Sequence, residues 1–319
     1  MPTVLLAGLA LLAVACTQSG HDGDAVMATL PTRPIPTTRP LPGTTGGGPG
    51  AVVTPAGVVL PVVSRPSGGG WTVRTPCGDT TTITKATPVP QALIVLDPGH
   101  GGSDPGARSP DNLYESQVNL AVARDAQTAL QRAGVSVLLT RTGDYDLDLA
   151  PRAEIARAVQ PLAFVSVHHN AEPDGPRAGP GSETYYQIGS SGSRRLAGLI
   201  YEEVVTALSQ YQVAWVADTD AGAKYRPGRT SGDYYAVLRL PGTVVSALAE
   251  LAFISNRPEA ALLARPDVQQ VEGDALARGI LRYLTTDDPG SGFTEPYPRV
   301  DPPPDPNAPP EPPCRDPQL

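Results

Sequence analysis

The sequence predicts an α/β domain with a single mixed, mostly parallel sheet that helices cover on both faces. Short apolar runs alternate with helical patterns between about residue 92 and residue 286, and this alternation is typical of sheets covered by helices. The most apolar runs are typical of strands that are buried on both faces. The 37 prolines and 33 glycines are unevenly spread along the chain, so we expect one folded core between irregular flanks.

The predicted elements follow one another in the order β-α-β-α-β-β-α-β-α. The first helix begins at Glu115 and ends at Gly134, with apolar residues repeating on one face. Because open α/β sheets carry their chemistry at the carboxyl ends of strands, side chains that follow a strand are the first candidates for a site. The predicted strands cover 92–97, 135–140, 163–168, 182–187 and 243–251, and the predicted helices cover 115–134, 150–160, 193–210 and 267–284.

Residues 1–16 indicate a signal for export. The apolar stretch from Val4 to Ala15 is too short to span a bilayer but fits the hydrophobic region of a signal peptide. Ala13 and Ala15 fit a cleavage site, whereas the small residues before Cys16 also resemble a lipoprotein signal, in which that cysteine is lipidated and anchors the protein to the membrane. Both readings predict an exported protein of the periplasm or cell wall.

Composition divides the rest of the chain. Residues 17–69 are rich in Pro, Gly and Thr and predict a flexible linker. Residues 70–91 alternate β-branched residues around Cys77 and predict a short β-hairpin. The core domain is expected at 92–286, and the Pro-rich residues 287–319 predict a C-terminal tail.

Charge and cysteine content narrow the function classes. The net charge of −8 gives no basic surface for nucleic acid or for an anionic membrane. If Cys16 is lipidated or removed, Cys77 and Cys314 are one even pair in an oxidising compartment, which favours a disulfide. Two unpaired thiols in the flanks are the alternative.

Three side chains predict a metal site at one edge of the sheet. His100 follows the first strand in a glycine-rich loop, Glu115 opens the first helix, and His168 ends the third strand. Each alone is more often structural, but two imidazoles, one carboxylate and an open position are the ligand set of catalytic zinc. The loop lacks the lysine and the spacing of a phosphate-binding loop, which argues against a nucleotide site.

Five motifs then resemble the zinc-dependent N-acetylmuramoyl-L-alanine amidases of the type 3 amidase family. They are "IVLDPGHGGSDPGA", "YESQVNLAVARDAQTALQRAGVSVLLTR", "SVHHNAEP", "GSETYY" and "ALAELAFISNRPEA". The resemblance implies that His100, Glu115 and His168 bind Zn²⁺ and that Glu250 is the catalytic glutamate. It also implies a monomeric peptidoglycan hydrolase that cleaves the amide between N-acetylmuramic acid and L-alanine, with a zinc-activated water and Glu250 as general base.

The chain departs from the family at several places. His169 and Ala252 stand where small residues and glycine are usual, and strand alternation sends His169 away from the face of His168, so His169 is expected to pack or to support the site. The segment between Asn170 and Ser182 is too short for the inhibitory insertion of some relatives.

Substrate contacts and rival functions follow from the same residues. The predicted substrate contacts are Asn170, Arg141 and Arg226. A wall-binding lipoprotein without activity would be expected to lose Glu250 or a metal ligand, and none is lost. A zinc carboxypeptidase or other metal-dependent peptidase acting on the stem peptide would share the mechanism and differ only in the bond cleaved.

Overall fold

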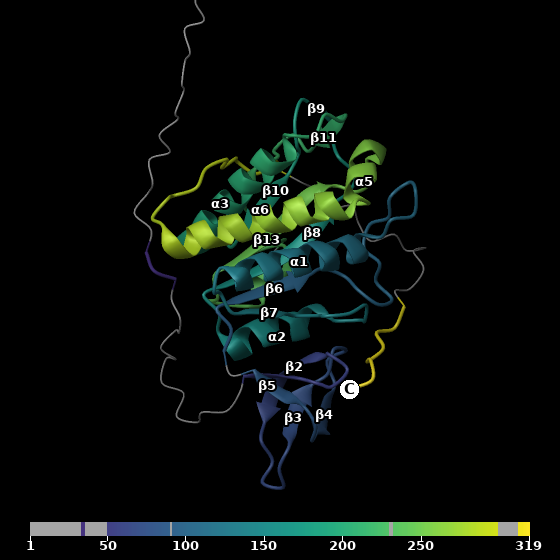
Figure 1. The fold of residues 1–319 in the computed structure, drawn as a ribbon, viewed down its shortest axis with the longest axis vertical. Helices are drawn as coiled ribbons and strands as arrows, with labels where there is room; N and C mark the ends of the chain where they lie inside the picture. The colour runs from purple at the N-terminus through teal and green to yellow at the C-terminus, as the bar shows by residue number, and fades with distance from the viewer. Residues whose placement is uncertain (1–32, 36–49, 90, 230–231, 299–311) are drawn as a thin grey trace, which may run out of the picture.

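The computed structural model describes residues 33–35, 50–89, 91–229, 232–298 and 312–319, and its centre is a six-stranded sheet (Figure 1). The strand order is β12-β10-β13-β8-β6-β7. All neighbouring strands pair in parallel except β10 and β13, which are antiparallel, and this confirms the mixed, mostly parallel sheet. The strands are β6 (Ile94–Pro98), β7 (Val137–Leu139), β8 (Ala163–Asn170), β10 (Glu183–Tyr186), β12 (Ala223–Lys224) and β13 (Ser246–Phe253).

Helices cover both faces of this sheet. The first face packs against α1 (Glu115–Arg132), α3 (Ser191–Leu208) and α6 (Pro266–Thr285), and together they enclose the larger apolar core. The second face packs against α2 (Leu149–Val159) and α4 (Ala236–Arg239), around a second core. The helix α5 (Arg257–Leu263) packs on α6 and β13. The fold is therefore the predicted α/β arrangement.

The helix α1 shows how the sequence pattern builds this fold. Its buried face carries Val118, Val122, Ala126 and Leu130, each fully buried, at the four-residue spacing that places side chains on one face of a helix. Gly134, at φ +84°, follows its last turn and adopts the left-handed conformation in which a helix commonly ends.

Every predicted strand and helix of the core overlaps an observed one, and the elements missing from the prediction are short. The helices α4 and α5 span four and seven residues. A separate two-stranded ribbon joins β9 (Gly175–Arg177) to β11 (Trp215–Ala217). Segments of two to seven residues contain too few repeats of an apolar period for a sequence pattern to reveal them.

The predicted linker is wrong over its last part, because residues 51–64 form two strands. They belong to a five-stranded antiparallel sheet with order β4-β3-β2-β1-β5, which lies beside α2 (Figure 1). Val59 and Leu60 are almost completely buried, so an apolar run inside a Pro- and Gly-rich region stabilises the sheet by burial. The remaining residues of the predicted linker lie mostly outside the described part. The strands are β1 (Ala51–Val53), β2 (Val59–Ser64), β3 (Trp71–Arg74), β4 (Thr80–Ile83) and β5 (Thr87–Val89).

The strands β3 and β4 pair in antiparallel within residues 70–91, the segment for which the sequence predicts a hairpin.

Beyond α6, residues 287–298 pack along α3. Arg194 stacks on Phe293, with its guanidinium carbon 3.5 Å from the ring centroid, and Ala223 donates a hydrogen bond to Gly292. No helix within the described ranges is long and apolar enough to cross a membrane. The predicted export signal, with Cys16, lies outside those ranges.

Candidate metal centre

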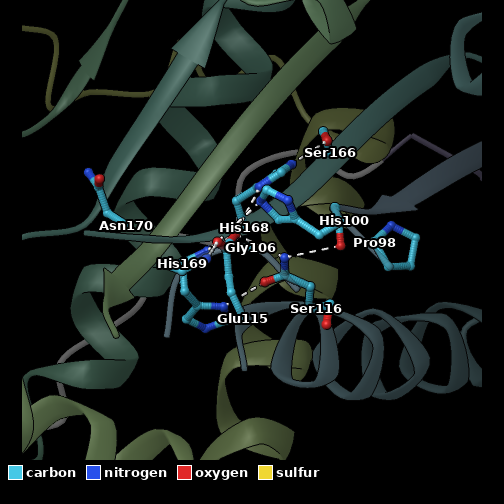
Figure 2. A network of polar contacts seen from close by, with 12 residues as sticks. Pro98, His100, Gly106, Glu115, Ser116, Ser166, His168, His169 and Asn170 are labelled. Carbon is cyan, nitrogen blue, oxygen red and sulfur yellow. Dashed lines mark hydrogen bonds and ion pairs between the residues drawn. The ribbon is translucent and has the colours of Figure 1, made fainter. Parts of the chain in front are cut away.

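The three predicted metal ligands meet at the carboxyl edge of the sheet (Figure 2). His100 lies in the loop after β6, Glu115 is the first residue of α1, and His168 lies near the end of β8. One potential ligand atom of each residue lies within 4.8 Å of those of the other two. Residues separated by up to 68 positions in the sequence are thus brought within reach of one ion.

Glycines and a strained backbone allow this close approach. A β-carbon at Gly99 would overlap the His168 ring, and one at Gly106 would overlap the His100 ring and the Glu115 carboxylate. His100 itself has φ +60°, a left-handed conformation that costs free energy for a residue with a side chain. Residues in such conformations are found most often at functional sites. The glycine-rich loop is therefore needed for packing around the site.

Hydrogen bonds hold the Glu115 carboxylate between the two imidazoles. Its Oε2 lies 3.1 Å from His100 Nε2 and its Oε1 lies 3.0 Å from His168 Nδ1. It also accepts the backbone N–H of Ala107 at 2.8 Å and that of His169 at 3.2 Å. Burial alone would raise the pKa of Glu115, but the hydrogen bonds and charges of the two histidines hold it well below its usual range.

The two histidines differ in their surroundings. Burial disfavours the charged form of His100, yet hydrogen bonds and charges from Asp104 and Glu115 outweigh it and raise the pKa to about 10. Burial lowers the pKa of His168. Asp104 Oδ2 lies 2.7 Å from His100 Nδ1, which is the carboxylate contact that typically orients a metal-binding imidazole.

These donors fit a divalent metal such as zinc. Two imidazoles and one carboxylate are the protein ligands of many catalytic zinc sites, and they leave a coordination position open. Glu115 is anionic and almost completely buried, and a buried carboxylate requires a compensating cation or hydrogen-bond donors. The same set therefore satisfies both the ligand chemistry and the charge balance of a zinc site.

Glu250 lies beside this centre on β13. In the sheet register it is opposite His168 on the parallel strand β8 and opposite Glu183 on the antiparallel strand β10, so the three side chains share one face. Its Oε2 is buried and has no hydrogen-bond partner among the described residues. Burial, and then the charges of Glu115 and Glu183, raise the pKa of Glu250 well above its usual value.

A buried ion-pair network beside Glu250 was not predicted. Lys224 Nζ lies 2.6 Å from Glu183 Oε1 and 2.6 Å from Asp220 Oδ1, and its side chain is 1% exposed. Glu183, Asp218 and Asp220 also bring their carboxylates within 4.8 Å of one another. Glu183 lies within the motif "GSETYY", but nothing in the sequence pairs it with a lysine 41 residues away.

The predicted substrate contact Arg141 is wrong. It is completely buried, and its guanidinium donates hydrogen bonds to the carbonyls of Pro98, Gly99, Ser116 and Gly143. A side chain that is fully engaged with backbone carbonyls holds the loop of His100 in place and has no access to substrate. An isolated arginine after a strand gives no signal that distinguishes these two roles.

The other two predicted contacts, Asn170 and Arg226, lie beside the ion-pair network of Lys224. Asn170 Nδ2 donates a 3.0 Å hydrogen bond to Glu183 Oε2. The Arg226 guanidinium carbon lies 3.7 Å from the centroid of the Tyr234 ring, and Arg226 lines a cavity of about 280 Å³ together with Tyr185. Their roles toward substrate stay predictions.

His169 supports the site from the opposite face of β8 (Figure 2). It is 1% exposed, its Nδ1 lies 2.8 Å from Asn119 Oδ1 and its Nε2 lies 3.4 Å from Glu272 Oε2. Asn119 Nδ2 in turn donates a 3.1 Å hydrogen bond to Glu115 Oε1. The His169 side chain is therefore connected to Glu115 through Asn119 and does not face the metal centre.

A larger cavity, of about 890 Å³, opens on the metal centre. Both His100 and His168 line it, and so do residues of the loop before α2 and of the C-terminal segment. A volume of this size is typical of ligand sites. The two imidazoles are therefore open to the space of this cavity.

A carboxylate and two imidazoles lie beside Glu250, whose buried Oε2 has no hydrogen-bond partner among the described residues, and this arrangement fits the site of a metal-dependent hydrolase. Comparison with known proteins identifies the family: the N-acetylmuramoyl-L-alanine amidase family matches residues 94–282, which is more than half of the chain, and the chain belongs to it.

Individual relatives agree with this assignment. The chain is 34% identical over 200 residues to the uncharacterized protein YqiI of Bacillus subtilis, covering 62% of this chain and 87% of YqiI. It is 32% identical over 212 residues to the germination-specific N-acetylmuramoyl-L-alanine amidase of the same organism, covering 62% and 82%. The solved structure of the amidase AmiC2 of Nostoc punctiforme is similar with a TM-score of 0.51 and 31% identity, over 60% of this chain and 97% of AmiC2.

Proposed function

We propose that this chain hydrolyses the amide bond between N-acetylmuramic acid and L-alanine in peptidoglycan, with zinc bound by His100, Glu115 and His168. The observation that carries the proposal is the meeting of these three donors with Glu250, whose Oε2 has no hydrogen-bond partner in the described part of the chain, in a member of the amidase family. The substrate lies outside the cytoplasm, which agrees with the export signal predicted in residues 1–16.

Zinc, when bound, would polarise the carbonyl of the lactyl group and would lower the pKa of a bound water toward about 7. Glu250 is the proposed general base, which accepts a proton from the attacking water. Its raised pKa makes the carboxylate a stronger base toward that proton, and the carboxylic acid so formed can pass the proton to the leaving L-alanine nitrogen. An amine leaves readily only when it is protonated, so the leaving nitrogen needs a proton donor. We assign to Glu250 both the removal of the proton from water and its delivery to this nitrogen.

The site loop and its supports hold these groups in position. Arg141 fixes the carbonyls of Pro98 and Gly99, the residues that connect β6 to His100. Asn119 and the backbone N–H of Ala107 fix the two carboxylate oxygens of Glu115. Rigid positioning of this kind retains the geometry of the reacting groups between turnovers.

The test is the chemistry of the products. Purified protein with zinc is incubated with a soluble peptidoglycan fragment, and mass spectrometry identifies the new ends. We expect a free amine on intact L-alanine and an unbroken sugar chain. Cleavage within the stem peptide would instead identify a peptidase and overturn the proposal, and absence of any product from a zinc-loaded, folded protein would overturn hydrolysis itself.

A further inference from the structure

The last eight residues of the chain, 312–319, are held firmly at the edge of the metal-site cavity. Cys314 forms a disulfide with Cys77, which lies in the turn between β3 and β4, and Asp316 Oδ1 accepts a 2.9 Å hydrogen bond from the backbone N–H of Cys77. Figure 1 places the C-terminus beside the five-stranded sheet. Both partners of the disulfide lie outside residues 94–282, the part that matches the amidase family.

Asp146 connects this C-terminal segment to the loop of the metal centre. One of its carboxylate oxygens accepts the backbone N–H of Arg315 at 2.7 Å, and the other accepts the backbone N–H of Ser103, in the His100 loop. Asp146 is 8% exposed, so both bonds are partly shielded from water. The C-terminal segment and the His100 loop therefore share one buried anchor.

The segment also faces the space above the metal centre. Pro312 and Cys314 line the cavity of about 890 Å³ that His100 and His168 line. The C-terminal segment is thus one side of the cavity, and the disulfide fixes that side covalently to a sheet that the family match does not include.

We propose that the C-terminal segment 312–319 is a wall of the subsite for the stem peptide, fixed in place by the disulfide between Cys77 and Cys314. This inference rests on the proposed amidase function. The glycan strand continues past the muramic acid in both directions, and a fixed wall would obstruct it. The stem peptide ends after a few residues, so a cavity with a fixed wall on one side can hold it. The wall makes binding depend on the length of the stem peptide, and it takes no part in the hydrolysis itself.

The test adds bulk at the wall. Pro312→Trp places a large side chain at a residue that lines the cavity, and Pro313→Trp is the matched control, because exposed Pro313 does not line it. The substrates are N-acetylmuramic acid bearing a pentapeptide and the same sugar bearing a dipeptide. We expect Pro312→Trp to raise the KM for the pentapeptide about tenfold more than that for the dipeptide, with Pro313→Trp like wild type.

A second variant tests whether the disulfide between Cys77 and Cys314 holds the wall in place. Cys77→Ser with Cys314→Ser removes the disulfide and should also raise the KM for the pentapeptide more than for the dipeptide, while the zinc content stays that of wild type. Val73→Ala, in the core of the five-stranded sheet, controls for loss of stability alone. Two results would overturn the proposed wall. One is equal KM values for Pro312→Trp and Pro313→Trp, and the other is an equal change in the KM of Pro312→Trp for the pentapeptide and the dipeptide. Failure of the wild type to cleave either substrate would instead count against the proposed function.

Discussion

Glu250 and Glu183 lie directly opposite each other on the antiparallel strands β13 and β10, and Lys224 pairs with Glu183. Two facing carboxylates in a buried place cannot both ionise without a compensating cation. The 2.6 Å contact of Lys224 Nζ with Glu183 Oε1 provides that cation on one side of the pair. Glu250, whose Oε2 lacks a partner among the described residues, is the carboxylate that remains for proton exchange.

Glu250→Gln should abolish most of the hydrolysis while the protein keeps its fold and its zinc. The amide has the shape of the carboxylate but cannot accept the proton, and general base catalysis typically contributes about 10² to 10⁴ in rate. Turnover of a soluble peptidoglycan fragment, zinc content and circular dichroism measure the three properties. A variant with wild-type turnover would remove Glu250 from the mechanism.

Lys224→Met should destabilise the fold by about 3–5 kcal/mol, because it leaves buried carboxylates without their cation. Arg278→Met is the matched control: it removes one partner of the more exposed pair with Glu203, and exposed pairs contribute up to about 1 kcal/mol. Denaturant unfolding of both variants gives the comparison. Equal losses in the two would show that the Lys224 network is not a main support of the site.

The sequence predicts that His100, Glu115 and His168 come together, as the structure shows, because these residues follow strands or open a helix. His100, Glu115 and His168 each stand next to a long apolar or amphipathic pattern, and such patterns position their ends reliably. The roles of Arg141 and Lys224 depend instead on partners far along the chain, which no local pattern identifies. The β1 and β2 strands were missed because prolines and glycines on either side concealed a short apolar run.

The purified protein should hold one zinc ion, and His100→Ala should lose most of it. Removing one imidazole leaves Glu115 and His168, and two protein ligands do not complete a zinc site of this type. Metal analysis after dialysis against a chelator measures the loss. Arg226→Ala, in the other cavity, should retain its zinc, and unchanged zinc in His100→Ala would mean that the ion binds elsewhere.

Asn119→Ala should weaken zinc binding without removing a ligand. Asn119 donates a hydrogen bond to Glu115 Oε1 and contacts His169 on its other side. Loss of such an outer hydrogen bond typically lowers metal affinity about 10- to 100-fold. Competition with a chelator gives the affinity, and an unchanged value would show that Glu115 is held sufficiently by its remaining bonds.

The protein should hydrolyse peptidoglycan without an added activator. The segment between Asn170 and Ser182 contributes β9, which pairs with β11 in a separate ribbon, so this segment is already engaged away from the metal centre. The cavity of about 890 Å³ leaves space beside His100 and His168, and among the described residues no helix fills it. Release of soluble fragments from purified cell walls measures the activity, with Glu250→Gln as the background. Turnover that appears only when a partner protein is added would show that another part of the chain blocks the site.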